Sequence, residues 1–400
     1  MPTDRLYYRD SYLREFTARV VSARPADGHT EVVLDRTAFY PEGGGQPADL
    51  GTLGGAPVVA VEEREEVVVH RVRGGLPQGE VVGRVDWERR FDHMQQHSGQ
   101  HLLSQAFERA LGARTVSFHM GPEGSAIDLD VTSLSQDQME SVETLANQVV
   151  LENRPILVQL VEPSDLGRFE LRKGTDRTEQ VRIVEIQDFD AIPCGGTHCR
   201  STGEIGPIKA IKEERRSGNA RVEFLCGWRA LRDYQAKNLA VVGLAAALSV
   251  RDRDVRGAVE RLQQESAEAR HQIGLLRNQL LDYRAEELSH RAEPVGRGSV
   301  IAALLDGGTP DELKHLANRL TEVPGRVVLL AAVGEQAHLV FARSEDLPFD
   351  AGVLLRQASG PFGGRGGGRP TLAQGGVPEP DKAQLVLEGA LRELRSILAV

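Results

Sequence analysis

Two short segments, far apart in the chain, combine side chains that bind metal ions. In FDHMQQHSGQHLLS, His93, His97 and His101 recur at every fourth position. On a helix they lie one turn apart on a single face, so any adjacent two could grip a metal ion. In IPCGGTHCRSTG, Cys194 and His198 repeat this spacing around a Gly-Gly pair, where the backbone can turn sharply. A thiolate together with imidazoles is a ligand set that suits Zn²⁺.

Each segment alone has a simpler interpretation. A single H-x-x-x-H on a helix is a weak signal, and a cysteine near a histidine is more often a small buried apolar residue than a ligand. The two segments strengthen each other because both offer two ligands at the same spacing. Together they predict zinc binding.

In the glycine-rich segment TAFYPEGGGQPADLG, polar residues lie next to consecutive glycines, whose backbone can adopt conformations that other residues avoid. The glycines at 43–45 precede Gln46, and Thr37 begins the segment. A tight loop is the simplest interpretation of consecutive glycines. The functional alternative is that backbone without side chains lets a ligand approach closely, with Thr37 and Gln46 as its polar contacts.

Two arginine-containing segments are candidates for phosphate binding. IKAIKEERRSGNARVEF carries Arg215, Arg216 and Arg221, and a solvated hairpin is an equally good interpretation of it. GPFGGRGGGRPTLAQGGV places glycines around Arg365 and Arg369, which favours either a disordered linker or a phosphate cradle of backbone amides and guanidinium groups. The net charge of -10 argues against a generally basic nucleic-acid-binding surface but leaves room for such local patches.

Composition limits the class of protein. The chain of 400 residues is long enough for about two to four domains, each with its own core. With 3 cysteines, two of them in CGGTHC, we expect no disulfide framework, which fits a reducing compartment. The N-terminal residues lack the apolar core of a signal peptide, and no run approaches the roughly 18 apolar residues of a membrane span. We therefore expect a soluble, cytoplasmic protein with no membrane partner.

The candidate residues fall in four segments of different pattern. Short β-branched runs separated by turns in residues 1–87 predict a small antiparallel β-barrel. From 88 to 227 the pattern becomes α+β, with the histidines on an amphipathic helix and CGGTHC on the loop after the strand QVRIVEI. Residues 228–293 predict a long helical, coiled-coil-like arm, and residues 294–400 a small α/β domain. The predicted fold class is therefore α+β and multidomain, with these four domains.

Apolar residues in the predicted arm follow alternating steps of four and three. The pattern is a heptad seam broken only by one serine. The preceding helical stretch is also apolar on one side, so the two helices could form an antiparallel hairpin, or the seam could meet a second chain in a homodimer. Both alternatives stay open. The seam comprises Val255, Val259, Leu262, Ser266, Ala269, Ile273, Leu276, Leu280 and Tyr283.

Five motifs, taken in order, resemble a known family. TAFYPEGGGQPADLG, HSGQHLL, SFHMGPEG, CGGTHC and GGRGGGRPTLAQGG are similar to those of AlaX-type alanyl-tRNA editing proteins of the long form. Such proteins resemble the editing and C-terminal portions of alanyl-tRNA synthetase, and the resemblance runs over nearly the whole chain. It implies a zinc-dependent hydrolase that cleaves the ester joining serine or glycine to tRNA(Ala).

The implied activity would correct errors that an alanine-binding pocket cannot avoid. A synthetase pocket that accepts alanine cannot strongly reject glycine, which is one methyl smaller, or serine, which adds only a hydroxyl. A second site must therefore act on the mischarged tRNA(Ala), and the resemblance does not rank serine against glycine. Thr37 and Gln46 match polar positions of the family's editing pocket, and we expect these catalytic-site residues to contact the amino-acid side chain and the ester region.

The resemblance also implies which side chains hold one zinc ion per chain. His93 is then an extra histidine with a structural or supporting role, and Cys199 stands where synthetases more often have an apolar residue, so it could compete for the metal. Zinc could activate the attacking water, which needs an open coordination position, or position the substrate, which four protein ligands slightly favour. The matching ligands are His97, His101, Cys194 and His198.

Motifs that the sequence lacks, and a domain that it shares with other families, limit the possible functions further. We find no Walker-type phosphate loop and no segment resembling the class II aminoacylation core, so we expect the chain to act after the synthetase. The C-terminal domain resembles one shared by alanyl-tRNA synthetases and DHH phosphoesterases, which implies a second contact with the tRNA. We expect the five arginines named above, three in the editing domain and two in the C-terminal domain, to bind the tRNA. The alternatives are a DHH-type phosphoesterase, for which the chain offers only DHM at Asp92, and a tRNA-binding protein without catalysis.

Overall fold

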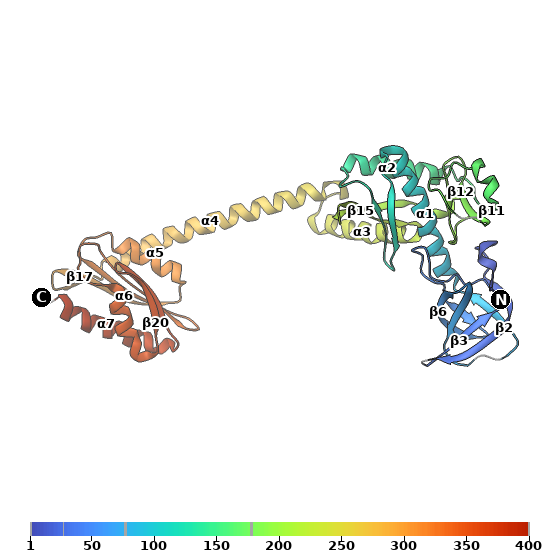
Figure 1. Ribbon diagram of the computed structural model, residues 1–400. Helices are drawn as coiled ribbons and strands as arrows, with labels where there is room; N and C mark the ends of the chain where they lie inside the picture. Colours follow the sequence, from blue (N-terminus) through green and yellow to red (C-terminus); the bar gives the residue numbers. More distant parts are fainter. Residues whose placement is uncertain (1, 27, 76–77, 177–178, 399–400) are drawn as a thin grey trace. The chain divides into compact units, whose positions relative to one another are not determined.

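The chain folds into two compact units, each of which mixes helices with β-sheets (Figure 1). This confirms the predicted α+β, multidomain class. The units comprise Met1–Ala247 and Leu248–Val400, so the predicted boundaries near 87 and 293 fall inside them and stay predictions. The computed structural model describes residues 2–26, 28–75, 78–176 and 179–398.

A closed barrel opens the first unit. Along strand β8, buried and exposed residues alternate throughout, so Val81 and Val85 point into the barrel while Val82 faces outward. A separate parallel pair joins β1 (Asp4–Arg5) to β4 (Arg36–Thr37). The barrel strands, in spatial order, are β2 (Glu15–Ala26), β3 (His29–Leu34), β7 (Val67–Val72), β6 (Ala56–Arg64), β5 (Gly51–Leu53) and β8 (Glu80–Val85).

Helix α1 (Trp87–Leu111) follows the barrel and carries the histidines. It begins where the Asp86 carboxylate accepts a hydrogen bond from the backbone N–H of Arg89 (3.2 Å), a regular N-cap. It ends at Gly112, whose φ of 67° is the left-handed conformation typical of a helix end. Between these ends it is buried on several sides, so its polar residues must find partners inside the protein.

Two antiparallel sheets and helix α2 (Gln136–Leu151) share one hydrophobic core with α1. The unit closes with α3 (Gly227–Leu248). One sheet has the order β14 (Ile208–Arg216), β15 (Asn219–Cys226), β10 (Ser125–Leu129), β9 (Thr115–Met120), and the other β11 (Ile156–Val161), β12 (Val181–Ile186), β13 (Asp190–Pro193). Short 3₁₀ turns lie at Leu6–Tyr8, Pro163–Arg168 and Thr202–Ile205.

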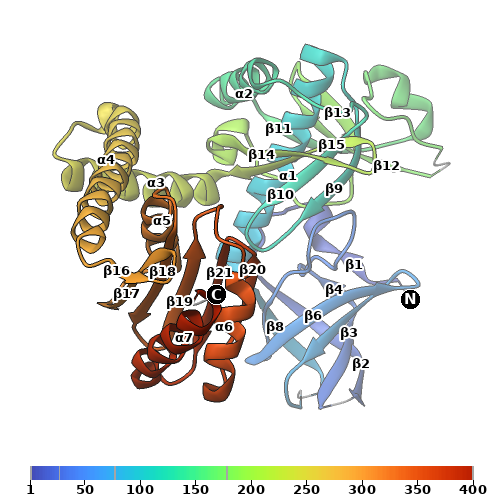
Figure 2. The ribbon, with the colours of Figure 1, turned by 90° about the vertical axis from the view of Figure 1, so that its left-hand side faces the viewer.

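The second unit is a six-stranded sheet covered by helices on both faces (Figure 2). The C-terminal part of α4 (Val255–Ser289) and α5 (Pro310–Leu320) pack on one face, and α6 (Ala351–Ser359) and α7 (Ala383–Leu398) pack on the other. The strand order is β16 (Glu293–Val295), β17 (Gly298–Asp306), β18 (Arg326–Val333), β19 (Ala337–Arg343), β21 (Leu372–Val377), β20 (Arg365–Arg369). Short 3₁₀ turns lie at Asp252–Asp254, Gly360–Phe362 and Pro380–Lys382.

The glycine-rich segment of this unit is the edge strand β20, neither a disordered linker nor an open loop. A Cβ atom on Gly366 would lie 2.5 Å from Leu355 Cδ2 and 2.6 Å from the carbonyl oxygen of Gln374. Glycine is therefore required because α6 packs closely on this edge of the sheet. Both Arg365 and Arg369 are exposed.

The heptad seam lies mostly on the exposed surface of α4. Leu276, Leu280 and Tyr283 expose 62%, 67% and 72% of their surface within this unit, so the pairing of the seam, within the chain or with a second copy, stays a prediction. In the part of the chain that the structure describes, no helix is long and apolar enough to cross a membrane.

Candidate metal centre

Two elements bring the predicted ligands together. His97 and His101 come from successive turns of α1, and Cys194 and His198 come from the loop after β13. One ligand atom from each of the four lies within 4.8 Å of the others. The structure therefore assembles a quartet that could hold a metal ion.

The distances within the quartet match the chemistry of a tetrahedral site. Cys194 Sγ lies 3.5 Å from His97 Nε2 and 3.3 Å from His198 Nε2. Zinc bonds of about 2.0–2.1 Å to nitrogen and 2.3 Å to sulfur separate neighbouring ligand atoms by about 3.3–3.6 Å. The ring centroids of His101 and His198 are 4.5 Å apart, so the third imidazole joins the same cluster.

Burial sets the protonation of the quartet. Burial lowers the pKa of His97 to about 3 and lowers the pKa of His101 and of His198 well below the ordinary value. The imidazoles are therefore neutral, which is the form that binds metals. Burial also raises the pKa of the Cys194 thiol, and a bound cation would oppose that shift by stabilising the thiolate. The donor set thus fits a zinc ion.

Neighbouring polar groups orient the ligand rings. His97 Nδ1 donates to Gln46 Oε1 (2.8 Å), which leaves its Nε2 facing the thiol, and His198 Nδ1 pairs with Ser98 Oγ (3.1 Å). Such a partner on the far ring nitrogen is usual for metal-binding histidines. The buried Nδ1 of His101 has no hydrogen-bond partner among the described residues.

Gln46 lies behind His97, fully buried. Its amide nitrogen donates to Thr197 Oγ1 (2.8 Å), and its oxygen also accepts from the Thr197 backbone N–H (3.1 Å). The loop fits here because Gly196 has no side chain: a Cβ atom would lie 2.9 Å from Gln46 Oε1 and would overlap the His97 ring. The contacts of Gln46 therefore join the barrel's glycine-rich loop to the CGGTHC loop.

Thr37 makes its hydrogen bonds within the barrel region. It is buried in the barrel region, where its hydroxyl hydrogen-bonds to His70 Nε2 (2.8 Å) and accepts from the Phe39 backbone N–H (3.1 Å). His70 Nδ1 in turn donates to the carbonyl oxygen of Val32 (3.1 Å). No hydrogen bond joins Thr37 to a quartet residue within the described ranges.

The two extra candidate ligands, His93 and Cys199, lie outside the quartet. Cys199 packs in the hydrophobic core, where burial raises the pKa of its thiol. His93 is also buried, and its Nδ1 has no hydrogen-bond partner among the residues described. Cys199 is therefore a core residue, whereas His93 is a buried residue with an unpaired polar atom.

Arg182 and Phe118 also contribute to the site, although the sequence predicts a role for neither: Phe118 belongs to the motif SFHMGPEG, and Arg182 belongs to no motif. Arg182 Nη1 donates to the Cys194 carbonyl oxygen (2.6 Å), while its buried Nη2 has no partner among the described residues. The Phe118 ring stacks on His97 with centroids 5.7 Å apart. A charged residue inside the buried strand VRIVEI is the signal that could have drawn attention to Arg182.

The predicted tRNA-binding arginines have different surroundings. Arg221 donates to both carboxylate oxygens of Asp128 (2.6 and 2.7 Å), so its charge is already paired within the sheet. Arg215 and Arg216 are exposed near the end of β14. Together with Arg365 and Arg369 of the other unit, they keep guanidinium groups at the surface.

Three family models match this chain. The second additional domain of threonyl and alanyl tRNA synthetases matches residues 181–223, which contain the CGGTHC loop, and the DHHA1 domain matches residues 297–396 in the second unit. The model described as tRNA synthetases class II (A) matches residues 12–89. This last match covers residues of the barrel, and the absence of a class II aminoacylation core stays a prediction.

Curated relatives match the chain over almost its full length. The alanyl-tRNA editing protein AlaX-L of Pyrococcus horikoshii is 33% identical over 99% of this chain and 100% of that protein. The alanine–tRNA ligase of Pyrococcus furiosus is 36% identical over 96% of this chain. This chain spans 43% of that ligase, less than half its length. Among solved structures, the C-Ala domain of Aquifex aeolicus alanyl-tRNA synthetase is 30% identical, with 27% of this chain and 98% of that chain covered and a TM-score of 0.25.

Proposed function

The chain belongs to the family of AlaX-type alanyl-tRNA editing proteins, and from this premise we propose that it deacylates mischarged tRNA(Ala). The reaction is hydrolysis of the ester that joins serine or glycine to the terminal ribose of tRNA(Ala). The substrate is a tRNA that the synthetase has already released, so the enzyme acts in trans. A cytoplasmic location, where charged tRNA is used, follows from the same proposal.

One observation carries the proposal: a half-buried Cys and three buried His side chains converge within 4.8 Å in a chain that matches an editing protein over nearly its full length. Such a donor set needs a cation to offset its burial, because a buried thiolate is otherwise costly. We therefore propose one Zn²⁺ per chain, held by His97, His101, Cys194 and His198. When bound, it would supply a Lewis-acidic charge next to the ester.

Residues around the quartet have complementary roles. Gln46 acts through His97 by fixing the ring that faces Cys194 Sγ. Arg182 places a guanidinium with an unpartnered N–H beside the same loop, where it would stabilise negative charge that develops on the ester oxygens. Thr37 remains our proposed contact for the hydroxyl of a seryl group, with its orientation set by His70.

Exposed arginines in both units are the proposed contacts for the tRNA body. Arg215 and Arg216 offer guanidinium groups near the end of β14, and Arg365 and Arg369 do so on β20. Two separate contacts on one RNA raise the effective concentration of its acceptor end at the quartet. A homodimer through α4 or the second unit is compatible with this arrangement.

A deacylation assay with Ser-tRNA(Ala), Gly-tRNA(Ala) and Ala-tRNA(Ala) tests the function. We expect rapid hydrolysis of one or both mischarged forms and slow hydrolysis of Ala-tRNA(Ala). Cys194→Ala should abolish hydrolysis and lower bound zinc to well below one per chain, with tRNA binding largely kept. Cys199→Ala is the matched control, since this neighbouring cysteine is buried but lies outside the quartet. Unchanged turnover in Cys194→Ala would contradict the zinc assignment.

A further inference from the structure

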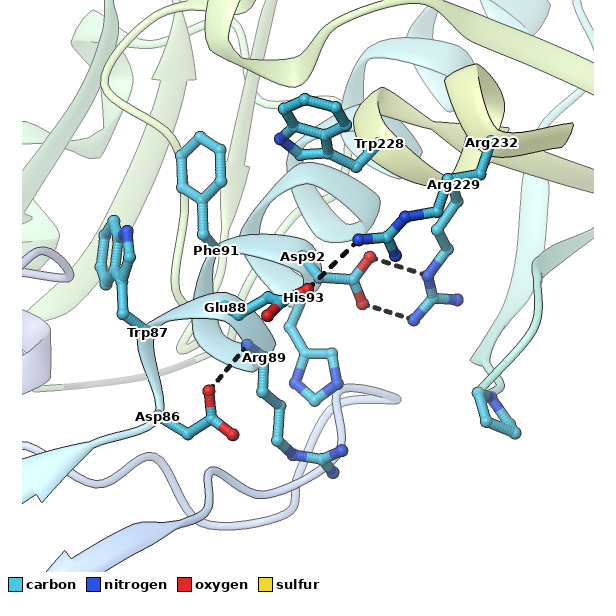
Figure 3. Close-up of a pocket in the computed structure, with 11 residues that line it drawn as sticks. Asp86, Trp87, Glu88, Arg89, Phe91, Asp92, His93, Trp228, Arg229 and Arg232 are labelled. Atoms are coloured by element: carbon cyan, nitrogen blue, oxygen red, sulfur yellow. Dashed lines mark hydrogen bonds and ion pairs between the residues drawn. The ribbon is translucent and has the colours of Figure 1, made fainter. Parts of the chain in front are cut away.

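A cleft of about 640 Å³ lies at the N-terminal end of α1, where α3 and the loop after β9 approach it (Figure 3). Its volume is within the range of sites for small organic groups. Its lining is unusual in combining aromatic rings with charged side chains. It comprises Asp86, Trp87, Glu88, Arg89, Phe91, Asp92, His93, Pro122, Trp228, Arg229 and Arg232.

One aromatic residue of the cleft, Trp228, has an exposed ring that is free to stack on a ligand. Trp87 and Phe91 stack on each other with centroids 5.5 Å apart, and the guanidinium of Arg14 lies 4.0 Å over Trp87. Trp228 differs: it is 55% exposed, and its ring has no aromatic or cationic partner among the described residues. A large exposed aromatic surface in a cleft marks a binding site for a flat apolar group.

His93 contributes a polar atom that the protein leaves unpaired. The residue is only 3% exposed, and its Nδ1 has no hydrogen-bond partner in the part of the chain described. Buried polar atoms nearly always have a partner. Because His93 lines the cleft (Figure 3), a bound group is well placed to supply the missing one.

The charges of the cleft cancel one another. Arg229 donates to both carboxylate oxygens of Asp92 (2.8 and 2.6 Å), and Arg232 pairs with Glu88 (3.2 Å). The remaining pair, Asp86 and Arg89, also has opposite signs. A site with balanced charge selects a neutral ring with polar edges over a free phosphate.

The cleft and the metal centre share one face of α1. His93 precedes His97 by four residues, which is about 6 Å along a helix and nearly the same direction around it. A ligand that places an ester at the quartet can therefore place its next flat group about one helical turn away, where His93 lines the cleft. In an aminoacylated RNA, that group is a base of the unpaired 3′ end.

We propose that this cleft binds a nucleobase of the single-stranded 3′ end of the RNA substrate, stacked on Trp228 and hydrogen-bonded at its edge to His93 Nδ1. Aromatic stacking of unpaired bases is a general mode of single-stranded RNA recognition. The inference rests on the proposed function, since the metal centre would handle the ester while the cleft orients the strand that carries it.

Intrinsic fluorescence gives a direct test because both tryptophans of the chain, Trp87 and Trp228, line the cleft. Titration of the full chain with the uncharged trinucleotide CCA should change tryptophan emission saturably. Trp228→Ala should weaken binding of labelled CCA, followed by anisotropy, about tenfold, as expected for a lost base stack. Trp228→Phe should restore most of it. Tyr234→Ala, which removes a 64% exposed ring elsewhere on α3, should have no effect.

Variants of His93 test the hydrogen bond. His93→Leu should weaken CCA binding several-fold, and His93→Asn, which keeps a polar group near Nδ1, should recover part of it. With a mischarged tRNA, Trp228→Ala should raise KM more than it lowers kcat. Unchanged emission on adding CCA, or equal CCA affinity in wild type and Trp228→Ala, overturns the cleft proposal even if deacylation is normal. Quenching by CCA without any deacylation supports the cleft and rejects the proposed function.

Discussion

The two compact units differ in what they bury. In the first unit the interior holds arginines, aspartates, glutamines and histidines together with the apolar core; in the second, the buried polar residues within the described ranges are Ser344 and Ser359. Burying polar groups is costly unless each finds a partner. The second unit is therefore stabilised mainly by apolar packing of helices on a sheet. The first unit buries many polar groups at a cost in stability, and these groups surround the candidate metal centre.

Helix α1 shows how the first unit meets this cost. Gln95 donates to the Glu204 carbonyl oxygen (2.9 Å), and Gln96 bonds both the N–H and the C=O of Cys226 (3.0 Å each). These side chains make directional hydrogen bonds where apolar contacts would otherwise lie. The bonds fix the orientation of α1 about its axis and its position against the neighbouring elements. The positions of His97 and His101 follow from that constraint.

Removal of the proposed metal should produce the largest difference in stability between the two units. Binding at a structural zinc site is worth about 10–16 kcal/mol in small zinc domains, so chelation should destabilise the first unit strongly and leave the second nearly unchanged. Hydrogen exchange with and without chelator would locate the change: faster exchange is expected in α1 and the loop after β13. Equal exchange in both states would show that the quartet does not depend on a metal.

The buried ion pair between Arg90 and Asp49 should give the next largest effect. Both side chains are fully buried, and Arg90 also donates to the carbonyl oxygens of Ser11 and Ala38. Asp49→Asn leaves an uncompensated guanidinium and should lower the free energy of unfolding by about 3–5 kcal/mol.

An exposed pair supplies the control for this prediction. Arg84 and Glu15 are 67% and 58% exposed, so Glu15→Gln should cost less than about 1 kcal/mol. Both variants are compared by denaturant unfolding of the full chain. If Asp49→Asn cost no more than Glu15→Gln, the first unit would not depend on its buried polar network.

Acid should weaken the first unit through His70. Burial lowers the pKa of His70 to about 4 from 6.5. Between these values the unfolded chain binds the proton and the folded chain does not, so the free energy of unfolding falls as the pH falls. The full difference corresponds to about 3 kcal/mol, of which about 2 kcal/mol is lost by pH 5.

The contribution of His70 is separated from other titrating groups by comparison with His70→Gln, which cannot titrate. The wild type should lose more stability than the variant between pH 7 and pH 5. The second unit has no buried histidine in the residues described, so its own unfolding should show no such histidine-linked loss. Parallel pH profiles of wild type and His70→Gln would contradict the prediction.

Features fixed by local periodicity could be predicted from the sequence. The spacing of His97 and His101 places them on one helical face whatever surrounds the helix, and the apolar runs of β17, β18 and β19 indicate buried strands. The Cys194 and His198 pair, which lies on a loop, could be recognised from its residue types and spacing instead. These inferences required no knowledge of which elements meet.

Features that depend on distant contacts could not be predicted. The glycines of β20 favour a loop by propensity, but they form a strand because they pair with β21, and the close approach of Leu355 explains why Gly366 has no side chain. Likewise the contact of Gln46 with substrate stays a prediction, and its bonds to His97 and Thr197, which the sequence does not indicate, exist because distant segments of the chain meet. Side-chain roles of this kind follow from tertiary structure alone.

The smallest effect we predict concerns Gln46, and it separates two roles for that side chain. If Gln46 orients His97, Gln46→Ala should weaken zinc binding about 10- to 100-fold, as loss of a supporting hydrogen bond does in other metal sites. Gln46→Glu keeps an oxygen that accepts from His97 Nδ1 and should retain much of the affinity. Competition with a chelator of known affinity measures this directly.

Substrate kinetics then decide between the roles. A residue that acts only through His97 should lose deacylation in proportion to lost zinc, so saturating zinc should restore Gln46→Ala. A residue that contacts the ester should keep its zinc and show a defect that added zinc does not relieve. Because Gln46 is fully buried and its amide already bonds Thr197 and His97, we expect the first result. That outcome would show that the buried polar interior of the first unit holds the ligands of the metal centre in position.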